Sequence, residues 1–277
     1  MNRELVFTAT FNEAGNIATW VEAVVRERPH ADILVIDDNS PDGTGQILAA
    51  LQARFISLSV IERKGKLGLA SAHRLAIRYA LINEYDVLVT MDADSSHQPD
   101  QITAVVSGLD HAEFCIGTRY RGGSHQASRF RRFLSLGANR LAMLTLRTGL
   151  SEYTTSFRAF SPRAMRTVDG MDITDGGYSF FIECVNGLAL SGCTMTEVPI
   201  DFLDRAHGVS KIPKSQVFLS ARTLAGLATR RKSIRQRSRV AVGHAALQRE
   251  CKTCQQPWLV LCEGGHHCLQ CAAVTPG

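Results

Sequence analysis

An alternation of short apolar runs with segments of helical spacing, through the first half of the chain, is the feature that most constrains the fold. The runs of strand character are 4–10, 32–38, 58–63, 85–94 and 113–120. The segments of helical spacing between them are 14–27, 43–55, 69–83 and 99–109. Strands separated by helices of this length predict an α/β fold, with a mostly parallel sheet covered on both faces. Ligands of such sheets bind beyond the carboxyl ends of the strands, so we expect the functional site there.

The second half of the chain is less regular. We expect a cation-rich helix over about 129–147, a helix over 179–191, a strand over 195–202 and a helix with one apolar face over 214–229. The run 230–239 then holds six cations and no acid. These changes divide the chain into an α/β domain over 1–229, a basic linker over 230–249 and a cysteine-rich tail over 250–277.

Two carboxylates, Asp92 and Asp94, stand where the fourth apolar run stops. Side chains of alternate residues project to the same side of a strand, so the pair can act together. Mg²⁺ and Mn²⁺ take oxygen ligands and commonly combine one or two protein carboxylates with substrate phosphates. The pair therefore predicts a divalent metal site on a diphosphate. The alternative is a solvated turn in which Asp94 caps the following helix.

Five motifs at the expected strand ends, read in order, resemble those of glycosyltransferases with a Rossmann-like GT-A fold. They are ATFNEAGNI, VIDDNSPDGTGQI, RKGKLGLASAHRLAI, MDADSSHQPDQI and IGTRY. Three further motifs resemble the dolichol-phosphate (polyprenol-phosphate) mannosyltransferases of glycosyltransferase family 2. They are RRFLSLGANRLAMLTLRTGLSEYTTSFRAF, GYSFFIEC and EVPIDFLDRAHGVSK. The resemblance covers about residues 4–228.

The resemblance implies roles for particular residues. The nucleotide-sugar would be bound by Thr10, Phe11, Glu13, Asp38 and Asp92. Mg²⁺ or Mn²⁺ would be held by Asp92 and Asp94, with Ser96 as a third polar group nearby. The acceptor phosphate would be bound by Arg119, Arg131, Ser135, Arg205 and Lys211. The catalytic group would comprise Asp92, Asp94, Arg119 and Arg205.

Several of these residues have a structural alternative. Glu13 can cap the first helix through backbone N–H groups, and Arg131 can belong to a solvated basic face. We interpret His97 as a turn residue satisfied by backbone groups rather than as a metal ligand. Buried ion pairs are the alternative for Arg158, Glu183 and Arg205.

The resemblance implies inverting transfer of a sugar, mannose from GDP-mannose, to a polyprenyl phosphate. A lipid phosphate is already ionised near neutral pH, so it can attack the anomeric carbon without a general base. Some residues differ from the family pattern and leave the sugar open: Ala9, Phe11, Glu152, Thr155 and Phe181. One alternative is therefore a UDP-sugar donor, with glucose or a related sugar. Another is a nucleotide-binding scaffold whose tail recruits a protein partner.

The tail contains two C-x-x-C pairs, Cys251 with Cys254 and Cys268 with Cys271, which predict a structural zinc site. Disulfides or free thiols are the alternative. Further ligands are available in Cys262, His266 and His267. A closed site of this kind has no catalytic position, so it suits docking of a protein partner.

A membrane surface is the other expected partner. No apolar run reaches the roughly 20 residues that span a bilayer, and the N-terminus does not resemble a signal peptide. The apolar face of 214–229 followed by the basic run favours anionic headgroups; the alternative is a helix packed on the core and a solvated linker. We expect a cytoplasmic protein, peripheral on the cytosolic face of a membrane. The basic run lacks aromatic partners, so we expect no nucleic acid.

Overall fold

The structure is a computed structural model that describes residues 2–125, 129–171, 179–203, 259–262, 265–268 and 274–275. Side chains are described for these residues except 125, 129–135, 138 and those after 203. Among the helices of this described part, none is long and apolar enough to cross a membrane. The expected helix over 214–229 and the basic linker lie outside the described residues.

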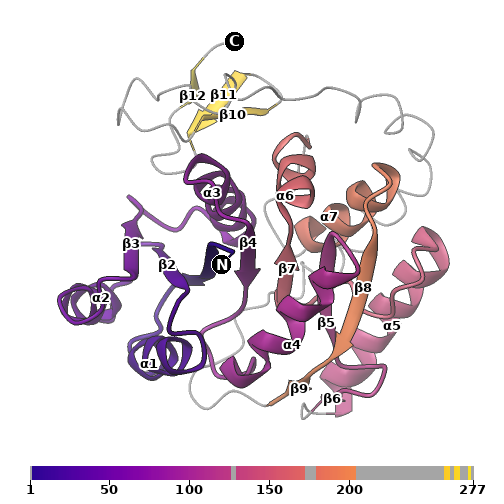
Figure 1. The fold of residues 1–277 in the computed structure, drawn as a ribbon, viewed down its shortest axis with the longest axis horizontal. Helices are drawn as coiled ribbons and strands as arrows, with labels where there is room; N and C mark the ends of the chain where they lie inside the picture. Colours follow the sequence, from indigo (N-terminus) through magenta and orange to yellow (C-terminus); the bar gives the residue numbers. More distant parts are fainter. Residues whose placement is uncertain are drawn as a thin grey trace.

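A seven-stranded sheet forms the centre of the molecule, in the order β3-β2-β1-β4-β7-β5-β8 (Figure 1). The strands are β1 (Glu4–Thr10), β2 (Asp32–Asp37), β3 (Leu58–Glu62), β4 (Val87–Thr90), β5 (Phe114–Thr118), β7 (Arg158–Phe160) and β8 (Met195–Pro199). All neighbouring pairs are parallel except those of β7, which runs antiparallel to both β4 and β5. The predicted mostly parallel α/β sheet is confirmed.

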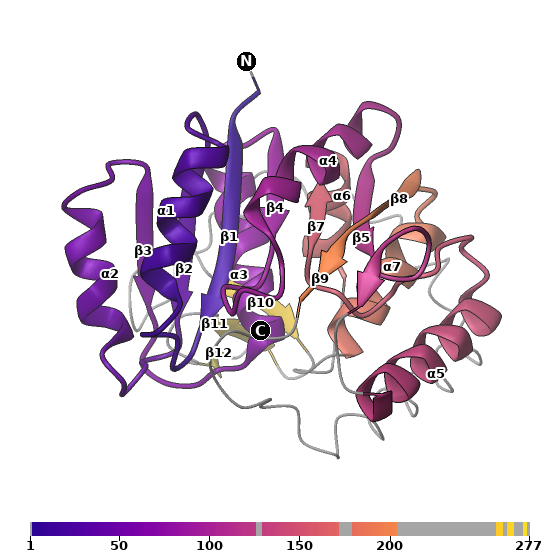
Figure 2. The same ribbon diagram turned by 90° about the horizontal axis from the view of Figure 1, so that it is seen from below.

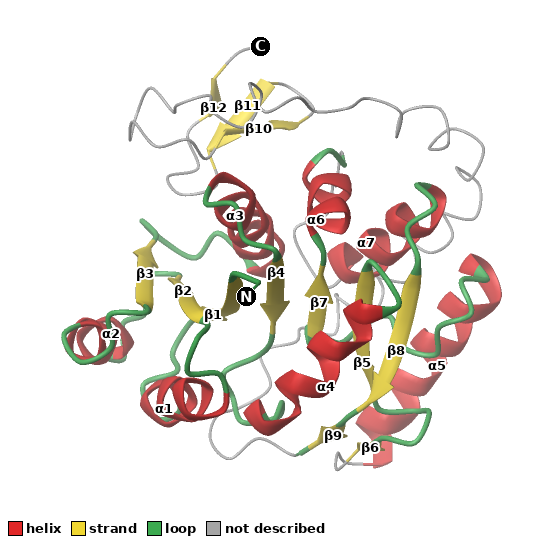
Figure 3. Ribbon diagram, viewed as in Figure 1, coloured by secondary structure: helices red, strands yellow, loops and turns green. Residues whose placement is uncertain are grey.

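Helices cover both faces of this sheet and form three layers with it (Figure 3). The helices and short 3₁₀ turns are α1 (Ile17–Glu27), α2 (Thr44–Gln52), α3 (Leu69–Ile82), η1 (Pro99–Gln101), α4 (Ile102–Ser107), η2 (Gly108–Asp110), α5 (Arg129–Leu146), α6 (Pro162–Asp169) and α7 (Ser179–Leu190). Helices α1, α2 and α4 lie on one face, and α3, α6 and α7 on the other. In Figure 2 the first group faces the viewer, and α5 lies out at the β5–β8 end of the sheet.

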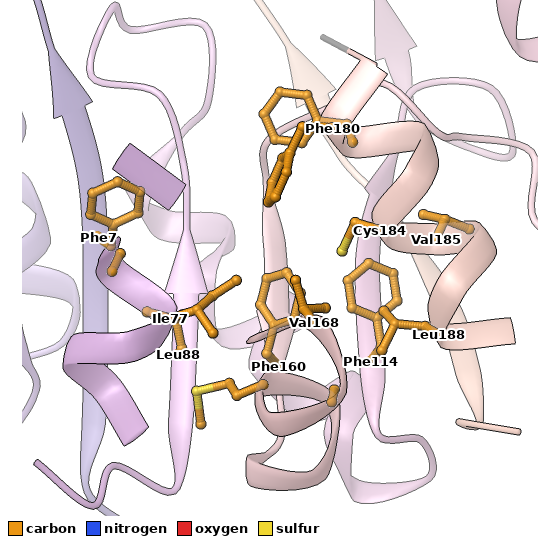
Figure 4. Close-up of a cluster of buried hydrophobic side chains, with 14 of the residues drawn as sticks. Phe7, Ile77, Leu88, Phe114, Phe160, Val168, Phe180, Cys184, Val185 and Leu188 are labelled. Carbon is orange, nitrogen blue, oxygen red and sulfur yellow. The ribbon is translucent and has the colours of Figure 1, made fainter. Parts of the chain in front are cut away.

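Two hydrophobic cores lie on the two faces of the sheet, and successive residues of a strand contribute to them in turn. In β1, Leu5 and Phe7 belong to the cluster under α3, α6 and α7, whereas Val6 belongs to the cluster under α1, α2 and α4. In β5, Phe114 and Cys115 divide in the same way. Figure 4 shows the first cluster, in which rings and aliphatic side chains from strands and helices meet. Because the central strands are buried on both faces, their sequences are mostly apolar.

The fourth strand is shorter than its apolar run predicts. β4 ends at Thr90, where its pairing with both β1 and β7 stops. The prediction that Asp92 and Asp94 alternate along a strand is therefore wrong. The backbone turns there instead: Ser95 has a φ of 65°, and the N–H of Ser96 donates to the carboxylate of Asp94.

Other differences have equally local causes. The expected strand 195–202 is divided into β8 and β9 (Asp201–Phe202), and β9 pairs with β6 (Ser124–His125). Neither β7 nor α6 was predicted. Three residues are too few to carry a strand pattern, whereas α6 has a conventional start, since the Ser161 hydroxyl accepts from the N–H of Ala164 and Pro162 follows it.

The cysteine-rich tail contains a small antiparallel sheet of β10 (Leu259–Cys262), β11 (Gly265–Cys268) and β12 (Val274–Thr275), in that order. Of the four predicted zinc ligands, Cys268 ends β11 and the other three lie outside the described residues. The structure therefore describes the sheet of the tail and not the predicted zinc site.

Candidate active site

Loops from five strands meet at one edge of the sheet. β1, β2, β4 and β5 end there, and β7 begins there because it runs antiparallel to its neighbours. The register pairs Thr90, at the end of β4, with Arg158, at the start of β7. The segment 152–157, which precedes β7, therefore lies beside the loop that carries Asp92.

The loops after β1 and β2 are held together by a buried carboxylate that the sequence did not single out. Asp37 accepts the hydroxyl of Thr10 at 2.6 Å and both the N–H and the hydroxyl of Ser40. The hydroxyl of Ser40 in turn accepts the N–H of Asn12 at 3.0 Å. Thr10, predicted as a nucleotide-sugar ligand, thus supports the loop through its side chain.

Asp38, predicted to bind the nucleotide, pairs with a buried arginine. Its carboxylate receives the guanidinium of Arg63, which is 2% exposed, and the N–H of Gly68 at 3.2 Å. Burial raises the pKa of the Asp38 carboxyl, and the attraction of Arg63 opposes this shift. The pair fixes the start and end of the 63–68 loop beside the end of β2.

The same loop reaches Phe11. The ammonium group of Lys66 lies over the Phe11 ring, 4.1 Å from its centroid, in a cation–π contact. Close by, the carboxylate of Glu13 accepts the amide of Asn16 at 2.8 Å, and the Glu13 carbonyl accepts the N–H groups of Asn16 and Ile17. Glu13 therefore helps to start α1 through its carbonyl and its contact with Asn16.

The two predicted metal ligands have different surroundings. Asp92 is held at Oδ1 by the hydroxyl of Ser156 at 2.6 Å, and its side chain is 36% exposed. Asp94 is 6% exposed, and its Oδ1 accepts the N–H of Ser96 at 3.1 Å and the hydroxyl of the same serine. The alternative of a solvated Asp94 that caps the next helix is wrong, because this carboxylate is buried and caps the turn at Ser96.

His97 joins the Asp92 loop to the segment before β7. Its Nδ1 accepts the N–H of Asp92 at 3.0 Å, so the proton is on Nε2, which donates to the hydroxyl of Thr155 at 3.0 Å. The ring is buried against Phe157 and Phe202. Burial lowers the pKa of His97 below its ordinary value, which favours this neutral form. The interpretation as a turn residue satisfied by backbone groups is confirmed for Nδ1 only, because Nε2 has a side-chain partner.

Arg119, at the end of β5, is paired with a fully buried glutamate. Its Nε donates to the carboxylate of Glu152 at 2.8 Å, and its Nη2 donates to the hydroxyl of Thr154 at 3.0 Å. Burial raises the pKa of the Glu152 carboxyl, but the Arg119 guanidinium and the hydrogen bonds from Thr154 together hold it below its ordinary value. The predicted phosphate ligand therefore already has a counter-charge in the structure.

The 152–157 segment is organised by a second buried cation. Arg158 donates to the carbonyls of Tyr153, Thr155 and Phe181, at 2.8, 2.8 and 3.1 Å. These three hydrogen bonds of Arg158 go to carbonyl oxygens and not to the carboxylate that the ion-pair alternative required. Burial lowers the pKa of Arg158 to about 10.

Helix α5 is anchored to the same segment by Asn139, which accepts the N–H of Tyr153 at 2.8 Å. The helix contains Arg131 and Ser135, whose side chains are not described. Arg205 and Lys211 lie outside the described residues. Among the residues that the structure describes, no group of three or more His, Cys, Asp or Glu side chains could hold a metal ion.

The sheet order, the helices on both faces and the carboxylates beyond the end of β4 define the GT-A class of glycosyltransferase folds. Residues 5–168 match the domain described as glycosyl transferase family 2. The chain belongs to glycosyl transferase family 2, and it is a glycosyltransferase.

Two relatives match most of the chain. Polyprenol monophosphomannose synthase of Mycolicibacterium smegmatis is 35% identical over 219 residues, which are 78% of this chain and 83% of the relative. Undecaprenyl-phosphate mannosyltransferase of Micrococcus luteus is 33% identical over 212 residues, which are 76% of this chain and 87% of the relative.

Solved structures share the fold at lower identity. Mannosyl-3-phosphoglycerate synthase from Rubrobacter xylanophilus has a TM-score of 0.61 at 15% identity, covering 94% of this chain and 82% of its own. Glucosyl-3-phosphoglycerate synthase from Mycobacterium tuberculosis, solved with Mn²⁺, UDP and phosphoglyceric acid, has a TM-score of 0.59 at 18% identity. The match covers 83% of this chain and 78% of the synthase. At this identity the likeness concerns the fold alone.

Proposed function

We propose that the enzyme transfers mannose from GDP-mannose to a polyprenyl phosphate. The observation that carries the proposal is the position of Asp92 and Asp94 beyond β4, beside the segment that holds Arg119. The names of the two relatives, a polyprenol monophosphomannose synthase and an undecaprenyl-phosphate mannosyltransferase, supply the sugar and the acceptor class.

The donor's diphosphate would lie at the Asp92 loop with a divalent ion. The residues suit Mg²⁺ or Mn²⁺, because carboxylate oxygens are the ligands that these ions prefer. Ser156 holds Oδ1 of Asp92, which leaves Oδ2 without a hydrogen-bond donor among the described residues. When bound, the ion would neutralise charge on the leaving nucleoside diphosphate. The nucleotide itself would lie toward Thr10, Phe11, Glu13 and Asp38, with Lys66 near the phosphates.

The acceptor phosphate would be bound by Arg119, Arg131, Ser135, Arg205 and Lys211. Since Glu152 already compensates the charge of Arg119, we assign more of the phosphate binding to the other cations. An ionised phosphate attacks the anomeric carbon without a general base, so the reaction would be a single displacement with inversion. The enzyme's residues then orient the two substrates and balance their charges.

A polyprenyl acceptor lies in a bilayer, so we propose that the enzyme works at the cytosolic face of a membrane. The apolar face of 214–229 and the basic run after it would supply the contact with lipid. We retain the division into a domain over 1–229, a linker over 230–249 and a tail over 250–277.

We also propose a structural zinc ion in the tail, held by Cys251, Cys254, Cys268 and Cys271. The pairing of Leu259 with Cys268 supports this set, because it brings the start of β10 and the end of β11 together. In the sequence, one C-x-x-C pair precedes β10 and the other begins at the last residue of β11, whereas Cys262 pairs with Gly265 at the other end of the hairpin.

The metal content of the purified chain tests the zinc site. We expect one zinc ion per chain by mass spectrometry, lost in Cys268→Ser and kept in Cys262→Ser, which serves as the matched control. Equal zinc content in all three proteins, or zinc lost only in the Cys262 variant, would contradict this ligand set.

The donor is tested by incubating the enzyme with polyprenyl phosphate, Mn²⁺ and, separately, GDP-mannose, UDP-glucose and UDP-N-acetylglucosamine. We expect lipid-linked mannose from GDP-mannose only, and a loss of about 100-fold or more in Asp94→Asn. Product from a UDP-sugar and none from GDP-mannose would contradict GDP-mannose as the donor. Transfer that is unchanged in the Asp94 variant would remove the metal role from the carboxylate pair.

A further inference from the structure

His97 occupies the point where three segments of the site meet. It lies in the loop after β4, donates to Thr155 in the segment before β7, and forms an isolated antiparallel bridge with Phe202 of β9. The neighbouring carbonyl of Ser96 also accepts the N–H of Leu203 at 3.1 Å. Both ring nitrogens have partners, and the side chain is 0% exposed.

One arm of this arrangement reaches the donor side. Nδ1 of His97 accepts the N–H of Asp92 at 3.0 Å, while the hydroxyl of Ser156 holds the carboxylate of the same residue at 2.6 Å. Asp92 is therefore fixed at its backbone by one residue and at its side chain by another. A carboxylate with a fixed backbone and a fixed rotamer loses little freedom when it binds a ligand.

The other arm reaches the acceptor side by two routes. The hydroxyl of Thr155 accepts a hydrogen bond from Nε2 of His97, its N–H donates to Glu152 at 3.3 Å, and Glu152 binds Arg119. In addition, the Phe202 ring lies between the two residues, 5.3 Å from the centroid of His97 and 4.8 Å from the guanidinium carbon of Arg119.

We propose that His97 is a positioning residue for two groups, Asp92 on the donor side and Arg119 on the acceptor side. The inference rests on the proposed function and goes beyond it, because it assigns separate tasks to the two ring nitrogens. Nδ1 positions the carboxylate that meets the donor's phosphates. Nε2 positions the turn at Thr155, and through it the guanidinium that meets the acceptor.

Two variants separate these tasks. In His97→Asn, the amide oxygen can stand in for Nδ1 and still accept from Asp92, but nothing reaches Thr155. In His97→Gln, the amide nitrogen can stand in for Nε2 and still donate to Thr155, but the acceptor for Asp92 is lost. Thr155→Val removes the Nε2 partner from the other side, and the same two substitutions at exposed His111 serve as matched controls.

The measurements are the Kd of the Mn²⁺–GDP complex by calorimetry, the KM for polyprenyl phosphate, and the midpoint of thermal unfolding. We expect His97→Gln to raise the Kd about tenfold or more with a smaller change in the acceptor KM. His97→Asn and Thr155→Val should raise the acceptor KM with a smaller change in the Kd. The His111 variants should change neither the Kd nor the KM.

Equal changes in Kd and KM in both His97 variants, in step with a lower unfolding temperature, would show a structural role alone and overturn the inference. Unchanged Kd and KM would do the same. If the unmodified enzyme neither binds Mn²⁺–GDP nor transfers mannose, the proposed function fails first, and the inference fails with it.

Discussion

Single buried ionisable residues determine the shape of the segment before β7. Glu152 accepts the N–H groups of Tyr153, Thr154 and Thr155, so one carboxylate satisfies a whole turn. Arg158 does the converse with carbonyl groups. A buried polar group without a partner costs free energy, which is why such residues occur together.

Arg158→Met should therefore destabilise the protein without changing the size of the side chain greatly. The substitution leaves the buried carbonyls of Tyr153 and Thr155 without the guanidinium donor and removes one donor from the carbonyl of Phe181 in α7. At about 1–3 kcal/mol for each unsatisfied group, the free energy of unfolding should fall by roughly 2 kcal/mol or more. Urea unfolding measures this, and a loss below about 1 kcal/mol would show that other donors replace the guanidinium.

His73 should make stability depend on pH. This residue of α3 is 3% exposed, lies 5.1 Å from the Phe7 ring and 5.0 Å from the Phe181 ring, and burial lowers its pKa to about 3. Its ordinary value is 6.5, so between these values the unfolded chain binds a proton that the folded chain does not. Stability from this group is complete above pH 6.5 and is lost as the pH falls toward 3, by about 1.4 kcal/mol per pH unit within the window.

Unfolding in urea at pH 7 and pH 5 tests this dependence. The unmodified protein should lose more stability between the two than His73→Phe, whose ring suits the aromatic neighbours and does not titrate. The same loss in both proteins would mean that His73 does not contribute, since other groups titrate equally in the two.

At the scale of elements, the turn between β5 and β6 depends on a close approach of backbones. A Cβ added at Gly123 would overlap the carbonyl oxygens of Thr118 and Ile200. The first accepts the N–H of Ile200 and the second accepts the N–H of Ser124, so neither can move without breaking a backbone hydrogen bond. Gly65 provides a matched control, because nothing lies within 4 Å of a Cβ added there.

Gly123→Ala should therefore lower the free energy of unfolding by about 1–3 kcal/mol, as overpacking does. It should also reduce transfer, because the turn continues from Arg119. Gly65→Ala should change the free energy of unfolding by no more than about 0.5 kcal/mol and the rate of transfer by no more than about twofold. Comparable unfolding curves for the two variants would contradict the close approach.

Elements with a repeating pattern could be predicted from the sequence, and short elements could not. β1 and β2 are largely buried strands with mostly apolar sequences, and their bounds agree with the expectation to within one residue. β4 was overextended because Met91 and Ala93 are also buried, so the apolar pattern continues past the last strand pair. In β7, Arg158 is a polar residue whose burial depends on carbonyls that only the fold brings near.

At the scale of the whole molecule, the location of the site could be predicted and its contacts could not. Parallel strands place their ends at one edge, so Asp38, Asp92 and Arg119 were expected together. Ser156 and Asp92 are 64 residues apart, and only the reversed direction of β7 brings them into contact. Nothing in the sequence near either residue indicates that.

The acceptor distinguishes this proposal from the two solved structures that share the fold, a mannosyl-3-phosphoglycerate synthase and a glucosyl-3-phosphoglycerate synthase. The most direct test offers the enzyme GDP-mannose with polyprenyl phosphate, polyprenol and 3-phosphoglycerate in one mixture, with products identified by mass spectrometry. We predict mannose on the phosphate of polyprenyl phosphate alone, with polyprenol and 3-phosphoglycerate unchanged. Mannose on 3-phosphoglycerate or on polyprenol, with none on the lipid phosphate, would contradict the proposed function.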